Sequence, residues 1–236
     1  MILSNFVIPS KINYQTNFEK PDSPNDCLNI DHFNNYPYNI TYKYNSRGFR
    51  DIEWPENLKD AIWCIGDSFT VGLGSPIEHT WPYLLSKATE LNTINISVNG
   101  ASNAWISRKA LELVATVKPK KIVIMWSYFY RRESDDTSLS DEERQIWSNN
   151  NKWQINYKDF KDNRDKVKNT NTHMIDCCIP DCWRGSKLFL GIDILPTLIK
   201  DKNFLGEVQL LDYARDYHHF DIKTSKYLVN KIIEKL

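Results

Sequence analysis

The stretch Ala61-Ile62-Trp63-Cys64-Ile65-Gly66-Asp67-Ser68 indicates the fold class of this chain. A short apolar run that stops at a glycine is typical of a buried strand followed by a sharp turn. Between positions 81 and 91, apolar residues recur every three or four positions, as on one face of an amphipathic helix, and Thr80 stands where it would cap that helix. We therefore expect a strand over 61–65 and a helix over 81–91.

Strand and helix patterns keep alternating along the rest of the chain. Further strands are predicted at 93–98, 121–126, 173–179 and 208–211, and further helices from Ser102 onward and over 227–236. Strands that are separated by helices are joined by crossovers and run parallel. The predicted fold class is therefore α/β, a three-layer α/β/α sandwich with a mostly parallel sheet and helices on both faces.

Two segments depart from this alternation. Residues 1–58 have no clear period and predict an irregular N-terminal arm packed on the core, with a short strand near 40–44. The core domain is expected to span 59–236. Within it, the highly charged stretch 131–170 predicts a partly helical insertion between the third and fourth strands.

Composition excludes several classes of protein. The 30 basic residues are balanced by 30 acidic ones, so the chain lacks the positive charge that a nucleic-acid binder needs. No apolar run approaches the ~18 residues of a membrane span, and residues 1–9 lack the basic region of a signal peptide. Five unevenly spaced cysteines do not suit a disulfide framework. We expect a soluble, cytoplasmic protein, and a bacterial or phage source fits the asparagine-, lysine- and isoleucine-rich composition.

Cysteine and histidine side chains near the fourth predicted strand raise the question of a zinc site. His173, Cys177, Cys178 and Cys182 lie close together in the sequence. However, Cys177 and Cys178 would point to opposite faces of a strand, and no paired C-x2-C motif is present. We expect buried cysteines and no metal.

Polar residues follow three of the predicted strands. They form the sequences Gly66-Asp67-Ser68, Asn99-Gly100-Ala101-Ser102 and Asp216-x-x-His219. Ligands of parallel α/β sheets bind beyond the carboxyl ends of the strands. A serine becomes a nucleophile when a histidine takes its proton, and an aspartate three residues before a histidine can orient it. We expect Ser68, His219 and Asp216 to act together, and the adjacent His218 is the alternative base.

These blocks resemble those of the SGNH (GDSL-type) hydrolase family of esterases and acetylhydrolases. The matching stretches are Gly66-Asp67-Ser68, Asn95-Ile-Ser-Val-Asn-Gly100, Asp216-x-x-His219 and an upstream Asn45-Ser-Arg-Gly-Phe-Arg50. The resemblance spans about residues 45–236. It implies a five-stranded, mostly parallel flavodoxin-like sheet, a Ser68–His219–Asp216 triad, an oxyanion donor at the Gly100 backbone N–H, and no metal or organic cofactor.

One block departs from the family pattern. After the third strand the family usually carries Gly-x-Asn-Asp, whose asparagine donates to the oxyanion, whereas this chain has Trp126-Ser127-Tyr128-Phe129-Tyr130-Arg131. A donor of that kind contributes about 3 kcal/mol to the transition state. Candidates to replace it are Asn103, Ser127, Tyr128 and Arg131, and we place Asn103 with Gly100 in the expected oxyanion and substrate-binding set.

The resemblance implies a serine esterase that hydrolyses a small acyl ester through an acyl-enzyme. By family analogy the substrate is a small molecule or a carbohydrate that carries an O-acetyl group. Because the stretch after the third strand departs from the family pattern, two alternatives stay open. One is a catalytically weakened glycan-binding or structural module, and the other is an acyltransferase that uses the same triad. No nucleic-acid or membrane partner is expected, and the oligomeric state is open.

Overall fold

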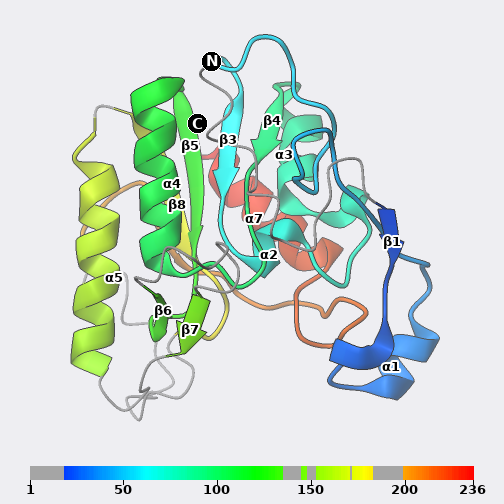
Figure 1. Ribbon diagram of the computed structural model, residues 1–236. Coiled ribbons are helices and arrows are strands. Elements are labelled where there is room, and N and C mark those ends of the chain that lie inside the picture. The colour runs from blue at the N-terminus through cyan, green and yellow to red at the C-terminus, as the bar shows by residue number, and fades with distance from the viewer. Residues whose placement is uncertain (1–18, 135–144, 148–152, 171, 183–198) are drawn as a thin grey trace.

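A parallel β-sheet forms the centre of the molecule in the computed structural model, which describes residues 19–134, 145–147, 153–170, 172–182 and 199–236 (Figure 1). Its five strands lie in the order β4-β3-β5-β8-β9, and every neighbouring pair is parallel. They are β3 (Ile62–Ile65), β4 (Thr93–Asn95), β5 (Lys121–Trp126), β8 (His173–Cys178) and β9 (Phe204–Glu207). The predicted α/β class is confirmed.

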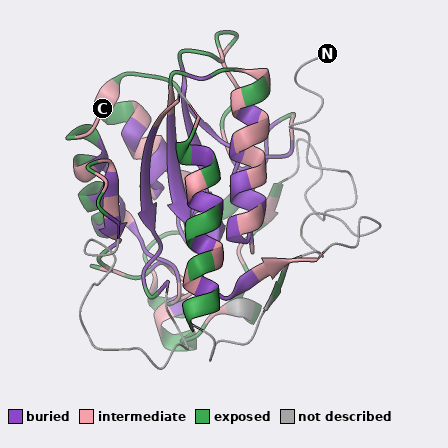
Figure 2. Ribbon diagram, turned by 90° about the vertical axis from the view of Figure 1, so that its left-hand side faces the viewer, coloured by how far each residue is buried: buried purple, intermediate pink, exposed green. Residues whose placement is uncertain are grey.

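Helices cover both faces of the sheet. They are α3 (Trp81–Thr89), α4 (Asn103–Thr116), α5 (Trp153–Lys168) and α7 (Ile222–Ile233). Helix α4 packs against α5 on one face, and α3 packs against α7 on the other (Figure 1). Every residue of β3 is buried because helices exclude water from both sides, and Figure 2 shows the visible strands of the sheet mostly as buried. This explains why the central strands have continuous apolar sequences.

The fifth strand and the last helix differ from the predicted positions. Strand β9 occupies Phe204–Glu207, ahead of the predicted 208–211, and its residues alternate between buried and half-buried. An edge strand covered in this way needs no continuous apolar run, so its sequence resembles a loop. Helix α7 begins at Ile222, before the predicted 227, because its first turn is largely polar and is held by the Asp212 carboxylate, which accepts the N–H groups of Lys223 and Thr224.

The expected helix caps have different outcomes. The Ser102 hydroxyl accepts the N–H of Trp105 at 3.3 Å and so caps α4, at the position from which the sequence predicted a helix. Thr80 stands at the N-cap of α3, but its hydroxyl donates to the carbonyl of Ile77 at 2.8 Å. A 3-10 turn over Ile77–His79 precedes α3 directly and supplies this nearer acceptor.

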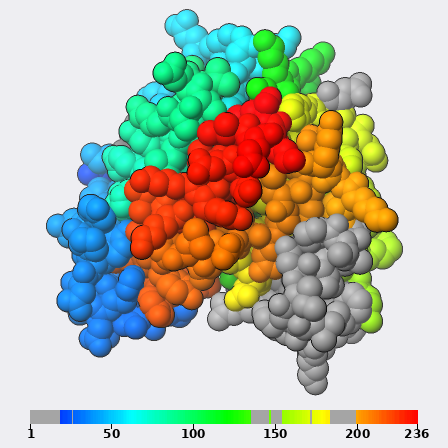
Figure 3. All heavy atoms as spheres, turned by 180° about the vertical axis from the view of Figure 1, so that it is seen from behind, coloured from blue at the N-terminus to red at the C-terminus, as the bar shows by residue number. Residues whose placement is uncertain are grey.

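The N-terminal arm contains regular structure of its own. Strand β1 (Glu19–Pro21) pairs antiparallel with β2 (Thr41–Lys43), and α1 (Ile30–Asn35) lies between them in sequence. Strand β2 falls within the predicted 40–44. Seen from behind, the arm lies against the C-terminal part of the chain (Figure 3), where the Leu28 N–H donates to the carbonyl of Asp216 at 2.8 Å. A wall of the candidate site therefore comes from the arm.

The charged stretch 131–170 contains both a hairpin and a core helix. Strand β6 (Arg131–Glu133) pairs antiparallel with β7 (Gln145–Trp147). Helix α5 follows and forms the crossover between β5 and β8, and its Phe160 is fully buried, with its ring 4.2 Å from that of Phe129. No helix in the described part of the chain is long and apolar enough to cross a membrane.

Candidate active site

Ser68 lies in the sharp turn that directly follows strand β3. It is the first residue of the short helix α2 (Ser68–Val71), and the preceding Asp67 caps that helix by accepting the N–H of Phe69 at 3.1 Å. A Cβ at Gly66 would lie 2.2 Å from the Thr70 hydroxyl oxygen, so the turn requires glycine there. The predicted strand-to-turn geometry thus presents Ser68 at the carboxyl edge of the sheet.

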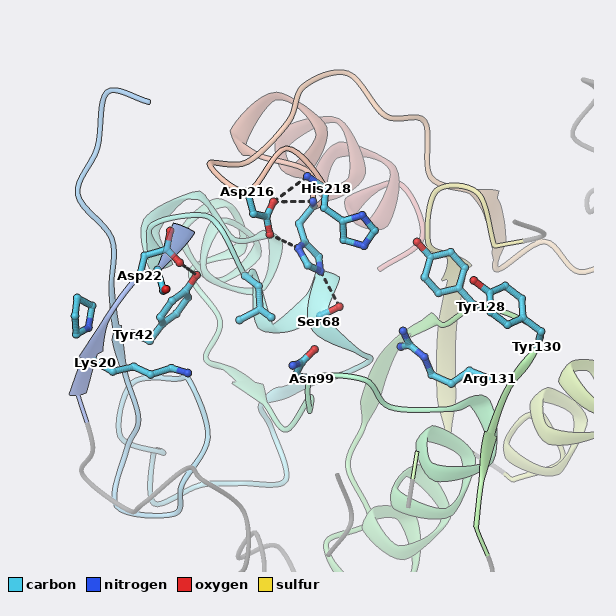
Figure 4. Close-up of a pocket in the computed structure, with 14 residues that line it drawn as sticks. Lys20, Asp22, Tyr42, Ser68, Asn99, Tyr128, Tyr130, Arg131, Asp216 and His218 are labelled. Atoms are coloured by element: carbon cyan, nitrogen blue, oxygen red, sulfur yellow. Dashed lines mark hydrogen bonds and ion pairs between the residues drawn. The ribbon is translucent and has the colours of Figure 1, made fainter. Parts of the chain in front are cut away.

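A chain of hydrogen bonds joins the three side chains expected to act together (Figure 4). The Ser68 hydroxyl lies 2.8 Å from Nε2 of His219, and Nδ1 of the same ring donates to Asp216 Oδ2 at 2.5 Å. The other carboxylate oxygen of Asp216 accepts the backbone N–H groups of His218 and His219. Tyr217, at φ 57°, turns the chain between Asp216 and His219. The structure therefore brings Ser68, His219 and Asp216 together.

The Asp216 carboxylate is poised to stay charged. Burial raises its pKa, but hydrogen bonds from the His219 ring and backbone, the His219 charge, and the His218 backbone N–H together hold the pKa below its usual value. A charged carboxylate fixes the tautomer in which His219 Nε2 accepts the serine proton. His218, the alternative base, lines the same cavity, but it is His219 that contacts Ser68.

Two backbone N–H groups are available beside Ser68. Gly100 ends the turn after β4 at φ 78°, a conformation that favours glycine. Among the described residues, no acceptor takes the N–H of either Ser68 or Gly100. The turns that carry them are tied together, because the Val98 N–H donates to the Gly66 carbonyl at 3.3 Å. This arrangement can offer both N–H groups to one oxygen.

The structure does not bring Asn103 into the cavity, so its expected oxyanion role needs correction. Its side chain is fully buried. Oδ1 accepts the Ser127 N–H at 2.8 Å, and Nδ2 donates to the Ser127 carbonyl at 3.2 Å. The carboxamide therefore replaces a missing backbone partner for the loop that follows β5. Asn103 thus positions that loop, and both ends of its carboxamide are already hydrogen-bonded there.

A buried polar network links the loop after β5 to the turn that carries Ser68. The Ser127 hydroxyl donates to Asp67 Oδ2 at 2.6 Å, and Arg131 Nη1 donates to the same oxygen at 3.2 Å. Nη1 also reaches the Ser127 hydroxyl at 2.9 Å and the Ala101 carbonyl at 3.4 Å. The ion pair between Arg131 and Asp67 is shielded from water, with side-chain exposures of 8% and 0%. The sequence did not indicate that Asp67 would have this buried ionic partner.

A cavity of about 440 Å³ opens over Ser68 (Figure 4). One side belongs to the arm, and the other to the loop after β5, where the rings of Tyr128 and Tyr130 stack at 5.4 Å. The lining residues are Lys20, Pro21, Asp22, Ser23, Tyr42, Ser68, Leu73, Asn99, Tyr128, Tyr130, Arg131, Asp216, His218 and His219. Nothing in the sequence of the arm pointed to this cavity, because only chain folding places the arm beside Ser68. The stretch 99–102 was expected near the site, but no role was predicted for Asn99.

The arm also holds the loop that carries Asp216 and His219. His32 Nε2 donates to the Ala214 carbonyl at 2.9 Å, and the Tyr36 hydroxyl donates to Asp221 Oδ2 at 2.5 Å. The opposite oxygen of Asp221 contacts His79 Nδ1 at 2.8 Å. The loop is thus fixed on both sides of His219. In the described residues no group of three or more histidine, cysteine or acidic side chains is placed to hold a metal ion.

Comparisons with known proteins find similarity in structure alone. No family model and no curated protein matches the sequence. Solved structures that match include a family two carbohydrate esterase from Clostridium thermocellum, crystallised with cellohexaose, at 16% identity and a TM-score of 0.46. That match covers 78% of this chain and 65% of the other, so this chain spans less than two thirds of the esterase's length.

Two further solved structures also match. An esterase from Pseudoalteromonas matches at 16% identity and a TM-score of 0.42, over 75% of this chain and 96% of that one. A GDSL-like lipase from Bacteroides thetaiotaomicron matches at 12% identity and a TM-score of 0.42, over 78% and 90%. The chain is thus similar in structure to GDSL-type hydrolases and carbohydrate esterases. At these identities and TM-scores, the argument for function rests on the side chains of the site.

Proposed function

We propose that this protein is a serine hydrolase that cleaves a small acyl ester through an acyl-enzyme. The observation that carries the proposal is the chain of contacts from the Ser68 hydroxyl to His219 Nε2 at 2.8 Å and from His219 Nδ1 to Asp216 at 2.5 Å. A nucleophile, a base and a group that orients the base are the parts that acyl transfer requires. The 440 Å³ cavity above them has the size of a small-molecule site.

Acylation begins when the Ser68 Oγ attacks the ester carbonyl carbon and its proton passes to His219 Nε2. The carbonyl oxygen becomes an oxyanion, which accepts the N–H groups of Ser68 and Gly100. Asp216 stabilises the imidazolium that forms. Collapse of the intermediate breaks the bond to the alcohol oxygen, and that oxygen takes the proton from His219.

Deacylation repeats the same steps with water. The water oxygen attacks the acyl carbon as one of its protons passes to His219 Nε2. Collapse of the second intermediate releases the carboxylic acid, and the proton returns to the Ser68 Oγ. Apart from the ester and the water, neither half-reaction needs another proton donor or acceptor, because His219 carries each proton from the attacking oxygen to the leaving oxygen.

The cavity lining favours a small polar ester such as an O-acetylated carbohydrate. The stacked rings of Tyr128 and Tyr130 supply an apolar face that suits a sugar ring. Lys20 and Asp22 supply charged groups that can hydrogen-bond hydroxyls. A long acyl chain would find few apolar partners here.

Intact-mass spectrometry after incubation with a fluorophosphonate tests the proposal. Wild-type protein should gain one adduct, Ser68→Ala should gain none, and Ser46→Ala, at an exposed serine, should behave as wild type. The same Ser68→Ala change should abolish hydrolysis of p-nitrophenyl acetate. Folded wild-type protein that gains no adduct would contradict the proposal and favour a glycan-binding module.

A further inference from the structure

The oxyanion expected at this site has one side-chain donor fewer than the family pattern supplies. The two backbone N–H groups of Ser68 and Gly100 occupy two of the directions around an oxyanion, and a third donor adds about 3 kcal/mol to transition-state stabilisation. The stretch 126–131 holds no asparagine to provide it. Another side chain beside Ser68 can take this place.

Most of the candidates named from the sequence are already used for positioning. The Asn103 carboxamide bonds both backbone groups of Ser127, and the Ser127 hydroxyl donates to Asp67. Arg131 Nη1 makes three bonds that hold the loops after β4 and β5 to the nucleophile turn. These side chains form the frame of the site. Their bonds fix the position of Ser68 and of the Gly100 turn.

Asn99 has the chemistry and the placement that these residues lack. It directly precedes Gly100, is half-buried, and lines the same cavity as Ser68 and His219. Figure 4 shows its carboxamide pointing into the cavity between Lys20 of the arm and Arg131. Among the described residues no side chain or backbone group hydrogen-bonds this carboxamide. A carboxamide has two N–H donors, and in Asn99 this group lies in the cavity close to Ser68.

The position of Asn99 is fixed by the turn that presents the Gly100 N–H. The neighbouring Val98 and Ala101 are both buried, and the Ala101 N–H donates to the Val98 carbonyl at 3.2 Å. Val98 is in turn bonded to Gly66 beside the nucleophile. A donor on such a turn moves little when charge develops on the substrate, which is the condition for effective oxyanion stabilisation.

We propose that Asn99 is a catalytic residue whose side-chain N–H donates to the oxyanion, in place of the asparagine missing after β5. This inference rests on the proposed esterase function, and it names a group that the sequence alone did not single out. The proton stays on the Asn99 nitrogen throughout, so the proton transfers of the acylation step are unchanged. Asn99 stabilises the substrate only as the carbonyl oxygen becomes charged, so its loss should lower kcat.

Replacement of Asn99 provides the test. Asn99→Ala removes the donor, and Asn99→Asp keeps the shape but turns the N–H group into an acceptor. Both should lower kcat for p-nitrophenyl acetate by about 10²- to 10³-fold and slow fluorophosphonate labelling similarly. KM should stay within about threefold because ground-state binding changes little. Asn92→Asp, at an exposed position directly before β4, adds the same charge and should leave both rates unchanged.

Three outcomes would overturn the inference. One is an Asn99→Ala variant that keeps kcat and the labelling rate within about threefold of wild type, against the hundredfold expected. Another is a loss of kcat in Asn99→Ala that comes with a lowered melting temperature, which would indicate a structural role. A third is that Arg131→Lys loses kcat while Asn99→Ala does not. Wild-type protein without Ser68-dependent labelling is distinct from all of these, because it would remove the esterase function itself.

Discussion

The Nε2 atom of His219 lies 2.8 Å from the hydroxyl of Ser68, although 151 positions separate the two residues in the sequence. Ser68 follows a central strand of the sheet, and His219 precedes the last helix, α7. The arm residues His32 and Tyr36 hold the loop of His219 from outside. The contact between Ser68 and His219 therefore depends on the packing of three distant parts of the chain.

Loss of the Asp216 charge should impair the chemistry far more than the fold. Asp216→Asn leaves the side chain in place but no longer stabilises the imidazolium of His219, so kcat should fall by about 10³- to 10⁴-fold. Steady-state hydrolysis of p-nitrophenyl acetate measures this. The matched control is Asp162→Asn on the exposed face of α5, where only a surface pair with Lys158 is lost. Equal activity of both variants would show that Asp216 has no part in catalysis.

The Asp51 carboxyl should make stability fall with rising pH. Burial raises its pKa to about 7, and the N–H groups of Asn95 and Ile52 offset this only in part. Because the folded protein binds the proton more tightly than the unfolded chain, stability contributed by the neutral form is present below about pH 4 and is lost between about pH 4 and 7.

Removing this titration should flatten the pH profile. In Asp51→Asn, the free energy of unfolding should change less between pH 4 and pH 7 than in wild type, by on the order of 3 kcal/mol. Urea denaturation at a series of pH values measures the difference between the two proteins. Parallel profiles for wild type and Asp51→Asn would mean that the carboxyl titrates with an ordinary pKa.

The buried pair of Arg131 and Asp67 should be strongly coupled. Arg131→Met leaves the Asp67 charge without its ionic partner in a fully buried place, which should lower the free energy of unfolding by about 3–5 kcal/mol. The double variant with Asp67→Asn should lose less than the sum of the two single changes. Lys43→Met is the control, because its pair with Glu19 is 71% and 57% exposed and should contribute less than about 1 kcal/mol. Additive losses would contradict the coupling.

Helix α5 should prove part of the core in spite of its charged sequence. Phe160→Ala removes a fully buried ring that stacks on Phe129, so the free energy of unfolding should fall by about 3–5 kcal/mol. Ile155→Ala on the same helix removes a side chain that is 59% exposed and should cost under about 1 kcal/mol. Chemical denaturation distinguishes the two, and a small loss at Phe160 would make α5 an appendage.

Local sequence was sufficient for the central elements of the fold. Strand β5 occupies Lys121–Trp126 as predicted, and β8 falls within the predicted 173–179. Central parallel strands are buried on both faces, so their composition is apolar without interruption and needs no knowledge of neighbours. The spacing of Asp216 and His219 was readable for a similar reason, because residues three apart meet within one turn.

Tertiary structure decided the rest of the site. The sequence singled out Asn103 for the oxyanion, yet Asn103 holds Ser127, and it is Asn99 that faces the cavity. Both are asparagines after the same strand, and which one faces the substrate depends on the partners that packing brings to each. The sequence did not predict that the arm would line the cavity or where strand β9 would lie, because both depend on contacts with distant residues. The sequence by itself pointed to Ser68, His219 and Asp216, and long-range packing decided which other side chains face the cavity.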